Sequence, residues 1–117
     1  MTVSDSGEPV YLRLRNLLAA SILEGEFAEG DQLPSVRAFA AEHGANPLTV
    51  AKAYQSLQDD GYVSVRRGVG MFVADGALDR LRGDQREQFL KETWPRVRAQ
   101  MVRLGIRPET LLARETV

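Results

Sequence analysis

The chain has 117 residues, enough for one ordinary domain with an extension, and its composition is ordinary for a globular protein. Fifteen Lys and Arg against sixteen Asp and Glu give a net charge of −1, which supplies no overall electrostatic reason to expect a nucleic-acid partner. The lack of Cys excludes a disulfide framework and thiolate chemistry, and a single His excludes a histidine-rich metal site.

No apolar run approaches the roughly 20 residues that span a bilayer. The first ten residues have no basic start and no apolar stretch, so we expect no signal peptide and a cytoplasmic protein without membrane association. Charge changes sign along the chain: residues 1–77 hold six basic and ten acidic side chains, and residues 78–117 hold nine and six. With a turn-like Asp75-Gly76, this predicts domains at 1–76 and 77–117.

Two helices are predicted in the first part of the chain. Pro9 suits a first helical turn, apolar residues then recur at helical spacing, and Gly25 is a good stop, so the first helix spans about 9–24. Ser35 is a natural N-cap, which predicts a second helix over about 35–43.

A third helix follows after a turn of only two residues, Gly44-Ala45. Asn46 provides the N-cap, Pro47 the first helical position and Gly61 the end, so this helix spans about 47–60.

Two β-prone runs come next, at 62–66 and 71–73, and a glycine-bearing turn joins them as a hairpin. The order predicts an α+β, mainly helical fold: an N-terminal winged helix-turn-helix domain followed by a small C-terminal helical region.

The outward face of the third helix suits DNA. Its buried stripe leaves Leu48, Thr49 and Lys52 facing outward near the N-terminus, where a helix in the major groove reaches base edges. Asn46 lies at the helix mouth, where free N–H groups favour a phosphate. The alternative is a core helix with a solvated polar face.

The hairpin tip adds a second candidate contact. Arg66 and Arg67 stand beside Gly68 and Gly70, and glycines let a backbone approach another surface closely. Such a tip suits phosphate or minor-groove contact, although an ordinary solvated turn has the same sequence pattern. Arg37, in the first turn of the second helix, is either a phosphate or base contact or a surface charge.

Four blocks together, at 33–40, 46–54, 57–61 and 66–73, resemble the GntR family of bacterial transcription regulators, in a form similar to the YtrA subfamily. The resemblance implies a dimeric winged helix-turn-helix repressor. We expect the homodimer to bind a palindromic operator, and we expect no cofactor. In two positions the chain departs from the usual pattern: Val36 replaces Glu, and Leu48 replaces Asn, Arg or Thr. The DNA-contacting residues expected from the pattern and the resemblance are Ser35, Arg37, Asn46, Pro47, Leu48, Thr49, Lys52, Arg66, Arg67, Gly68 and Gly70.

The C-terminal forty residues carry a heptad-like apolar seam that buries too little to fold alone. We expect it to form a homodimer interface, with packing on the first helix as the alternative. Pro95 interrupts the seam, so a continuous helix is kinked there, or Thr93 caps a separate helix. A short last helix starts near Pro108. The expected interface residues are Leu90, Trp94, Val97, Met101 and Leu104.

Other function classes are less favoured. A winged-helix protein-interaction module without DNA binding suits the acidic balance of residues 1–77, but residues 32–70 carry four cations against three carboxylates, and all four cations fall at predicted DNA-facing positions. An enzyme would have to use His43, which stands at a helix end with no catalytic partner motif, so no catalytic residue is assigned. No metal site is expected, and a small-molecule effector stays unknown.

Overall fold

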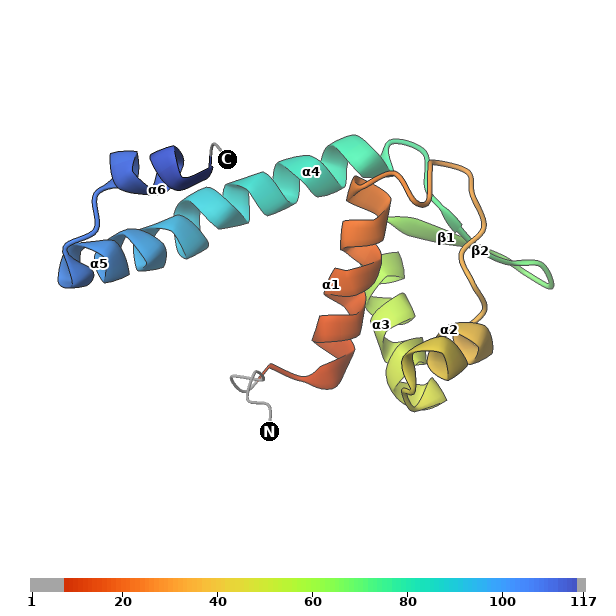
Figure 1. Ribbon diagram of the computed structural model, residues 1–117. Helices are drawn as coiled ribbons and strands as arrows, with labels where there is room; N and C mark the ends of the chain where they lie inside the picture. The colour runs from red at the N-terminus through yellow and green to blue at the C-terminus, as the bar shows by residue number, and fades with distance from the viewer. Residues whose placement is uncertain (1–7, 116–117) are drawn as a thin grey trace. The chain divides into compact units, whose positions relative to one another are not determined.

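The computed structural model describes residues 8–115, so most of the stretch in which we expect no signal peptide lies outside the described residues. Three helices, a hairpin and a further helical segment follow one another (Figure 1). The elements are α1 (Val10–Leu23), α2 (Val36–His43), α3 (Pro47–Asp59), β1 (Val63–Arg66), β2 (Gly70–Val73), α4 (Ala77–Gln88), the π-helical turn η2 (Phe89–Thr93), α5 (Trp94–Leu104) and α6 (Pro108–Glu115).

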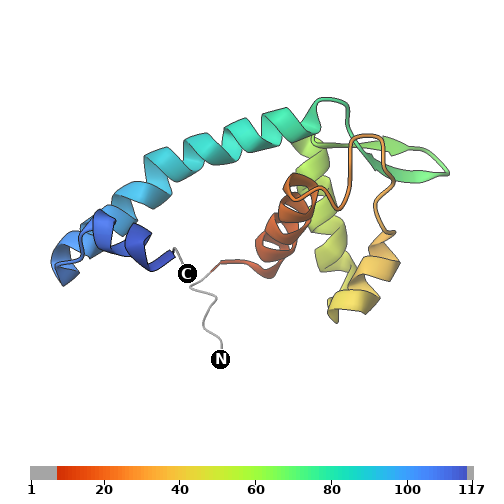
Figure 2. The same cartoon turned by 45° about the horizontal axis from the view of Figure 1, so that its top comes forward.

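The predicted elements of the N-terminal half are confirmed to within one residue at each end. Helices α1 and α3 lie side by side, and α2 packs across the start of α3 (Figures 1 and 2). The fold is mainly helical with one small sheet, as the alternation of helical and β-type spacing predicts.

The hairpin is antiparallel, with a register running from Val63 opposite Val73 to Arg66 opposite Gly70. Its tip stands clear of the three helices in both views (Figures 1 and 2). The loop before α2 pairs with the outer edge of β2, because the Leu33 N–H donates to the Met71 carbonyl at 2.8 Å and the Val73 N–H donates to the Asp31 carbonyl at 2.9 Å. This loop therefore protects an edge that a two-stranded hairpin leaves unpaired.

One apolar core holds the helix-turn-helix and the hairpin together. It takes residues from α1, α2 and α3, from the loop before α2, from both strands and from the first turns of α4. The burial of these side chains stabilises the small domain, because the removal of apolar surface from water is the main favourable contribution to the free energy of folding. The core residues are Leu18, Ala19, Ile22, Leu33, Phe39, Ala40, Val50, Tyr54, Leu57, Tyr62, Val63, Val73, Ala77 and Leu81.

The chain divides into two compact units, the first ending at Arg82 and the second beginning at Gly83. This division falls later than the boundary expected after residue 76. The reason is that Ala77 and Leu81, on the first turns of α4, are buried in the core of the first unit.

The structure of the C-terminal unit decides between a kinked continuous helix at Pro95 and a separate helix capped by Thr93. Thr93 has helical torsion angles and its side chain makes no capping hydrogen bond, so the expectation that it caps a separate helix is wrong. The helix continues instead through η2, the wider turn directly before α5. Proline has no N–H and its ring crowds the carbonyl four residues earlier, and a π-helical turn accommodates both defects. Gly105 ends α5 in the left-handed conformation.

Among the residues that the structure describes, no helix is both long and apolar enough to cross a membrane.

Candidate nucleic-acid interface

The turn between α2 and α3 is fixed by local capping. Gly44 ends α2 in the left-handed region, at φ 61°, and the Ala45 N–H donates to the Ala40 carbonyl at 2.9 Å. The Asn46 side chain then accepts from the Leu48 N–H at 2.8 Å, and Pro47 occupies the first turn of α3. Because of these caps, α3 starts directly after the turn. The position of its first residue then determines which face of α3 points outward.

The N-terminal face of α3 presents the predicted recognition residues. Leu48 is 80% exposed and Thr49 is half-buried, while Val50 beside them belongs to the core. Lys52 is exposed, but its ammonium lies 4.3 Å from the centre of the Tyr11 ring of α1. Because this cation–π contact holds the lysine on the protein surface, a DNA contact by Lys52 has to compete with it.

Two residues predicted to contact DNA stand at the start of α2, which packs against α3. The Ser35 hydroxyl accepts from the Ala38 N–H at 3.0 Å, so Ser35 acts first as the N-cap of α2. Arg37 is exposed on the first turn of that helix. A cation there is free of the core and able to reach a phosphate.

The hairpin tip, which we call the wing, carries two exposed arginines of different character. Arg66 lies over the Phe72 ring at 4.0 Å, whereas Arg67 is exposed in the turn itself. The Val69 N–H closes the turn onto the Arg66 carbonyl at 2.9 Å, and Gly68 has a φ of 79°. The predicted turn geometry is thus present, with Arg67 as the less restrained cation.

Gln32 braces the wing, a role that sequence reasoning missed. Its side-chain amide donates to the Val69 carbonyl at 2.9 Å from a position in the loop before α2. A Cβ atom on Gly70 would come within 2.4 Å of the same amide nitrogen, and Gly70 has a φ of 147°. Gly70 therefore lets Gln32 reach the wing tip, and no local sequence signal shows this long-range partner.

Tyr54 joins α3 to the start of α2. Its hydroxyl donates to the Pro34 carbonyl at 2.6 Å, and its ring is almost fully buried. Burial, with a smaller contribution from the negative charge of Glu42, raises the pKa of Tyr54 to about 12. Only the neutral Tyr54 hydroxyl can donate the hydrogen bond to the Pro34 carbonyl. Burial favours this neutral form, so it also favours the hydrogen bond.

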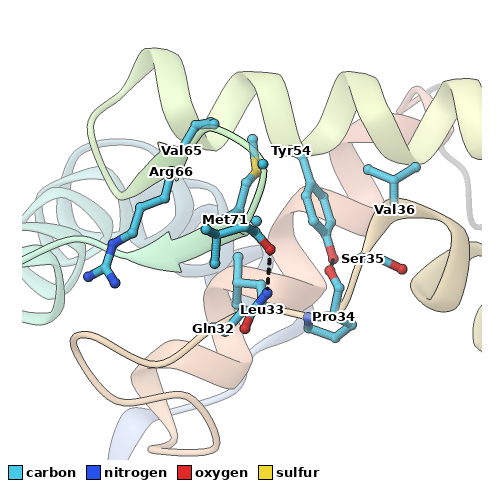
Figure 3. Close-up of a pocket in the computed structure, with 12 residues that line it drawn as sticks. Gln32, Leu33, Pro34, Ser35, Val36, Tyr54, Val65, Arg66 and Met71 are labelled. Atoms are coloured by element: carbon cyan, nitrogen blue, oxygen red, sulfur yellow. Dashed lines mark hydrogen bonds between the residues drawn. The ribbon is translucent and has the colours of Figure 1, made fainter.

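A groove of about 360 Å³ separates the wing from the start of α2. In Figure 3, Val65 and Met71 of the hairpin lie on one side, and Pro34, Val36 and Tyr54 lie on the other. The two predicted contact regions, at the start of α2 and in the wing, thus flank one shared depression.

Two observations concern the histidine and the acidic side chains of the described residues. The His43 ring packs against the Phe39 ring, with ring centres 4.1 Å apart and the planes tilted by 39°. Within residues 8–115 no group of three His, Cys, Asp or Glu side chains is placed to hold a metal ion.

A tight helix-turn-helix with an exposed recognition face and a basic hairpin tip defines the winged helix-turn-helix class of DNA-binding domain. Residues 10–73 match the family described as "Bacterial regulatory proteins, gntR family". The chain belongs to this GntR family and is a DNA-binding transcriptional regulator.

Individual relatives agree with this assignment. The HTH-type transcriptional regulator YhcF of Bacillus subtilis is 33% identical over 92% of this chain and 87% of its own length. The transcriptional repressor YtrA of the same organism is 38% identical over 65% of this chain and 58% of its own length. A GntR family regulator from Listeria monocytogenes has a TM-score of 0.74 at 29% identity, over 91% of each chain.

These similarities decide between the function classes that the sequence left open. The relatives are transcriptional regulators rather than enzymes, which confirms that expectation. The match to a family of bacterial regulatory proteins favours DNA binding over a winged-helix module that binds only other proteins. The resemblance to the GntR family and to YtrA is confirmed.

Proposed function

We propose that two copies of this chain bind one palindromic or nearly palindromic operator and repress transcription by occupying the promoter. The observation that carries the proposal is the exposed face of α3 formed by Leu48, Thr49 and Lys52, next to a basic wing, in a chain of this family. A protein of this kind acts on chromosomal DNA, so the proposal places it in the bacterial cytoplasm.

The contacts divide into two kinds. The start of α3 enters the major groove, where Thr49 and Lys52 reach base edges or phosphates and Leu48 touches a thymine methyl group. Arg67 and the backbone at Gly68 contact phosphates or the minor groove. Asn46, Pro47, Ser35 and Gly70 contribute mainly by holding the two elements in place.

Leu48 sets the base preference in this proposal. It is the most exposed large apolar side chain in the described part of the first unit, at 80% exposure. An apolar side chain offers no hydrogen bond, so at its position it favours a thymine methyl group over the polar edge of a G·C pair.

Dimerisation is proposed to use the C-terminal unit. Leu90, Val97 and Leu104 of the predicted seam are apolar yet 53%, 38% and 63% exposed in the single chain. Exposed apolar residues repeated along one helical segment indicate a protein interface. Trp94 is half-buried and Met101 is buried within the chain, so these two expose less surface to a partner than the other three.

We propose repression rather than activation because the relative YtrA is described as a transcriptional repressor. A dimer bound across a promoter blocks RNA polymerase by occupancy, which needs no further domain. We assign no effector.

The proposal is tested by selecting bound sequences from a pool of random DNA duplexes. The expected outcome is enrichment of an inverted repeat whose half-sites lie about one helical turn apart, bound by two chains per duplex in native mass spectrometry. Enrichment of a single unrepeated site, or one chain per duplex, contradicts the dimeric proposal. No enrichment at all contradicts specific operator binding.

A further inference from the structure

The start of α4 is capped by a side chain that lies far away in the sequence. Glu29, in the loop between α1 and α2, accepts from the Gly76 N–H with one carboxylate oxygen at 2.9 Å and from the Leu78 N–H with the other at 3.2 Å. The first N–H groups of a helix lack partners inside the helix, and a carboxylate there is stabilised by the helix dipole. Glu29 therefore ties the first turn of α4 to this loop.

A second contact holds the same turn from another direction. The Arg80 guanidinium donates to the Gly61 carbonyl at 2.6 Å and lies 5.6 Å from the centre of the Tyr62 ring. Arg15 of α1 lies over the same ring at 5.9 Å and pairs with Asp60 at 2.5 Å. The segment joining α3 to β1 is thus held by arginines from two helices.

Glu29 and Arg80 together connect α4 to both DNA-contacting elements. The loop that carries Glu29 continues into the strand-like segment that pairs with β2, and Gly61 closely follows the end of α3. Ala77 and Leu81 are fully buried against the core between these two contacts. The first turns of α4, which belong to the first unit, are thus held at their cap, along their buried face and by Arg80.

We propose that Glu29 and Arg80 form a clamp that holds the first turns of α4 on the core of the DNA-binding unit, and that this attachment governs which spacing between operator half-sites the dimer accepts. This inference rests on the proposed dimeric operator binding. Glu29 and Arg80 are positioning residues here: they act on spacing through α4 and do not themselves touch DNA.

The test uses Glu29→Ala in the full chain, with Glu26→Ala as the matched control. Glu26 is an exposed carboxylate near the start of the same loop, and its side chain makes no hydrogen bond or ion pair with the residues that the structure describes. A second pair is Arg80→Ala with Arg82→Ala, since Arg82 makes an exposed pair with Asp79 at 3.8 Å. Affinity is measured by fluorescence anisotropy for the selected inverted repeat, for repeats with one to three base pairs added or removed, and for an isolated half-site.

Wild type and both controls should prefer one spacing sharply. In Glu29→Ala and Arg80→Ala, the ratio of affinities between the best and the altered spacings should fall by about threefold to tenfold. Affinity for the half-site and the sedimentation of the free dimer should stay unchanged. This combination would show that geometry is altered while the contacts to DNA are intact.

An unchanged spacing profile in both clamp variants overturns the inference, and so does an equal loss at every spacing. If circular dichroism shows that Glu29→Ala unfolds α4, Glu29→Gln keeps one acceptor oxygen and should give an intermediate loss of discrimination; a wild-type profile in that folded variant also overturns the inference. A wild-type protein with no preferred spacing contradicts the dimeric operator proposal itself, independently of the variants.

Discussion

Tyr54→Phe removes a hydroxyl that joins α3 to the start of α2. The ring is 2% exposed and stays buried in the variant, so the change isolates the 2.6 Å hydrogen bond to the Pro34 carbonyl. Losing a hydrogen bond and leaving its acceptor without a partner costs about 1 to 1.5 kcal/mol of unfolding free energy. At pH 8 we expect the variant to be less stable by that amount.

The cost should depend on pH with a defined sign. Burial raises the pKa of Tyr54 from 10.0 to about 12, so its stabilising contribution is full below pH 10 and is lost as pH rises through 12. At pH 11 the wild type should have lost about 1.4 kcal/mol from this group, the free energy of one pKa unit. The Tyr54→Phe variant has no ionisable group at this position, so the difference between the two proteins should nearly vanish.

The assay is urea unfolding followed by circular dichroism at pH 8 and pH 11. Tyr11→Phe serves as the control at pH 8, because the Tyr11 hydroxyl makes no hydrogen bond with the described part of the chain. A difference between wild type and Tyr54→Phe that stays constant or widens at pH 11 would refute the reasoning about the buried phenol. No difference at pH 8 would refute the hydrogen bond's contribution.

Four further variants test the DNA-binding account. Arg67→Ala should weaken binding to all sequences alike and lower the salt dependence of log K by about one unit of slope; an unchanged slope argues against the wing contact. Thr49→Ala should cost about 1 to 3 kcal/mol on the selected site and relax discrimination at one position, whereas equal losses on random DNA would mean that it contacts phosphate. Gln32→Ala should reduce DNA affinity with little loss of stability, because it frees the wing turn; full affinity would show that the brace is dispensable. Trp94→Ala should dissociate the dimer in light scattering, and a retained dimer would place the interface elsewhere.

The elements could be predicted because their ends are encoded locally. Ser35 and Asn46 each cap the helix that follows them, and Gly44 ends the helix before it, so three residues of known conformational preference define the helix-turn-helix. These signals need no knowledge of the rest of the chain. The exposed face of α3 followed from the same spacing.

The partners of Gln32 and Glu29 could not be predicted, since each acts across a large separation in sequence. Gln32 reaches the wing at Val69, and Glu29 reaches the cap of α4 at Gly76. In the sequence both are polar residues of an ordinary loop. Only the fold brings them to the groups that they bind.

The C-terminal helix shows a different limit. The apolar seam indicated a helix through 90–104, and Pro95 indicated an irregularity, but the sequence did not say which one. A helix that begins after a cap at Thr93 and a continuous but distorted helix both accommodate the missing N–H and the ring of Pro95. Hydrogen bonding within η2 and α5 decides for the distorted helix.

The positions of the charged residues also say more about DNA binding than the net charge does. The net charge of −1 conceals exposed Arg37, Lys52, Arg66 and Arg67 around the predicted interface. Long-range attraction to DNA should therefore be weak, and affinity should come from a few placed contacts made twice by a dimer.

The central claim is that the start of α3 and the wing are the surfaces that meet DNA. Hydrogen–deuterium exchange of the full chain, with and without the selected duplex, tests this most directly. The account predicts protection on DNA binding at residues 46–52 and 66–70, with α6 unchanged. Protection confined to α1 or to α5, with residues 46–52 and 66–70 unaffected, would contradict it.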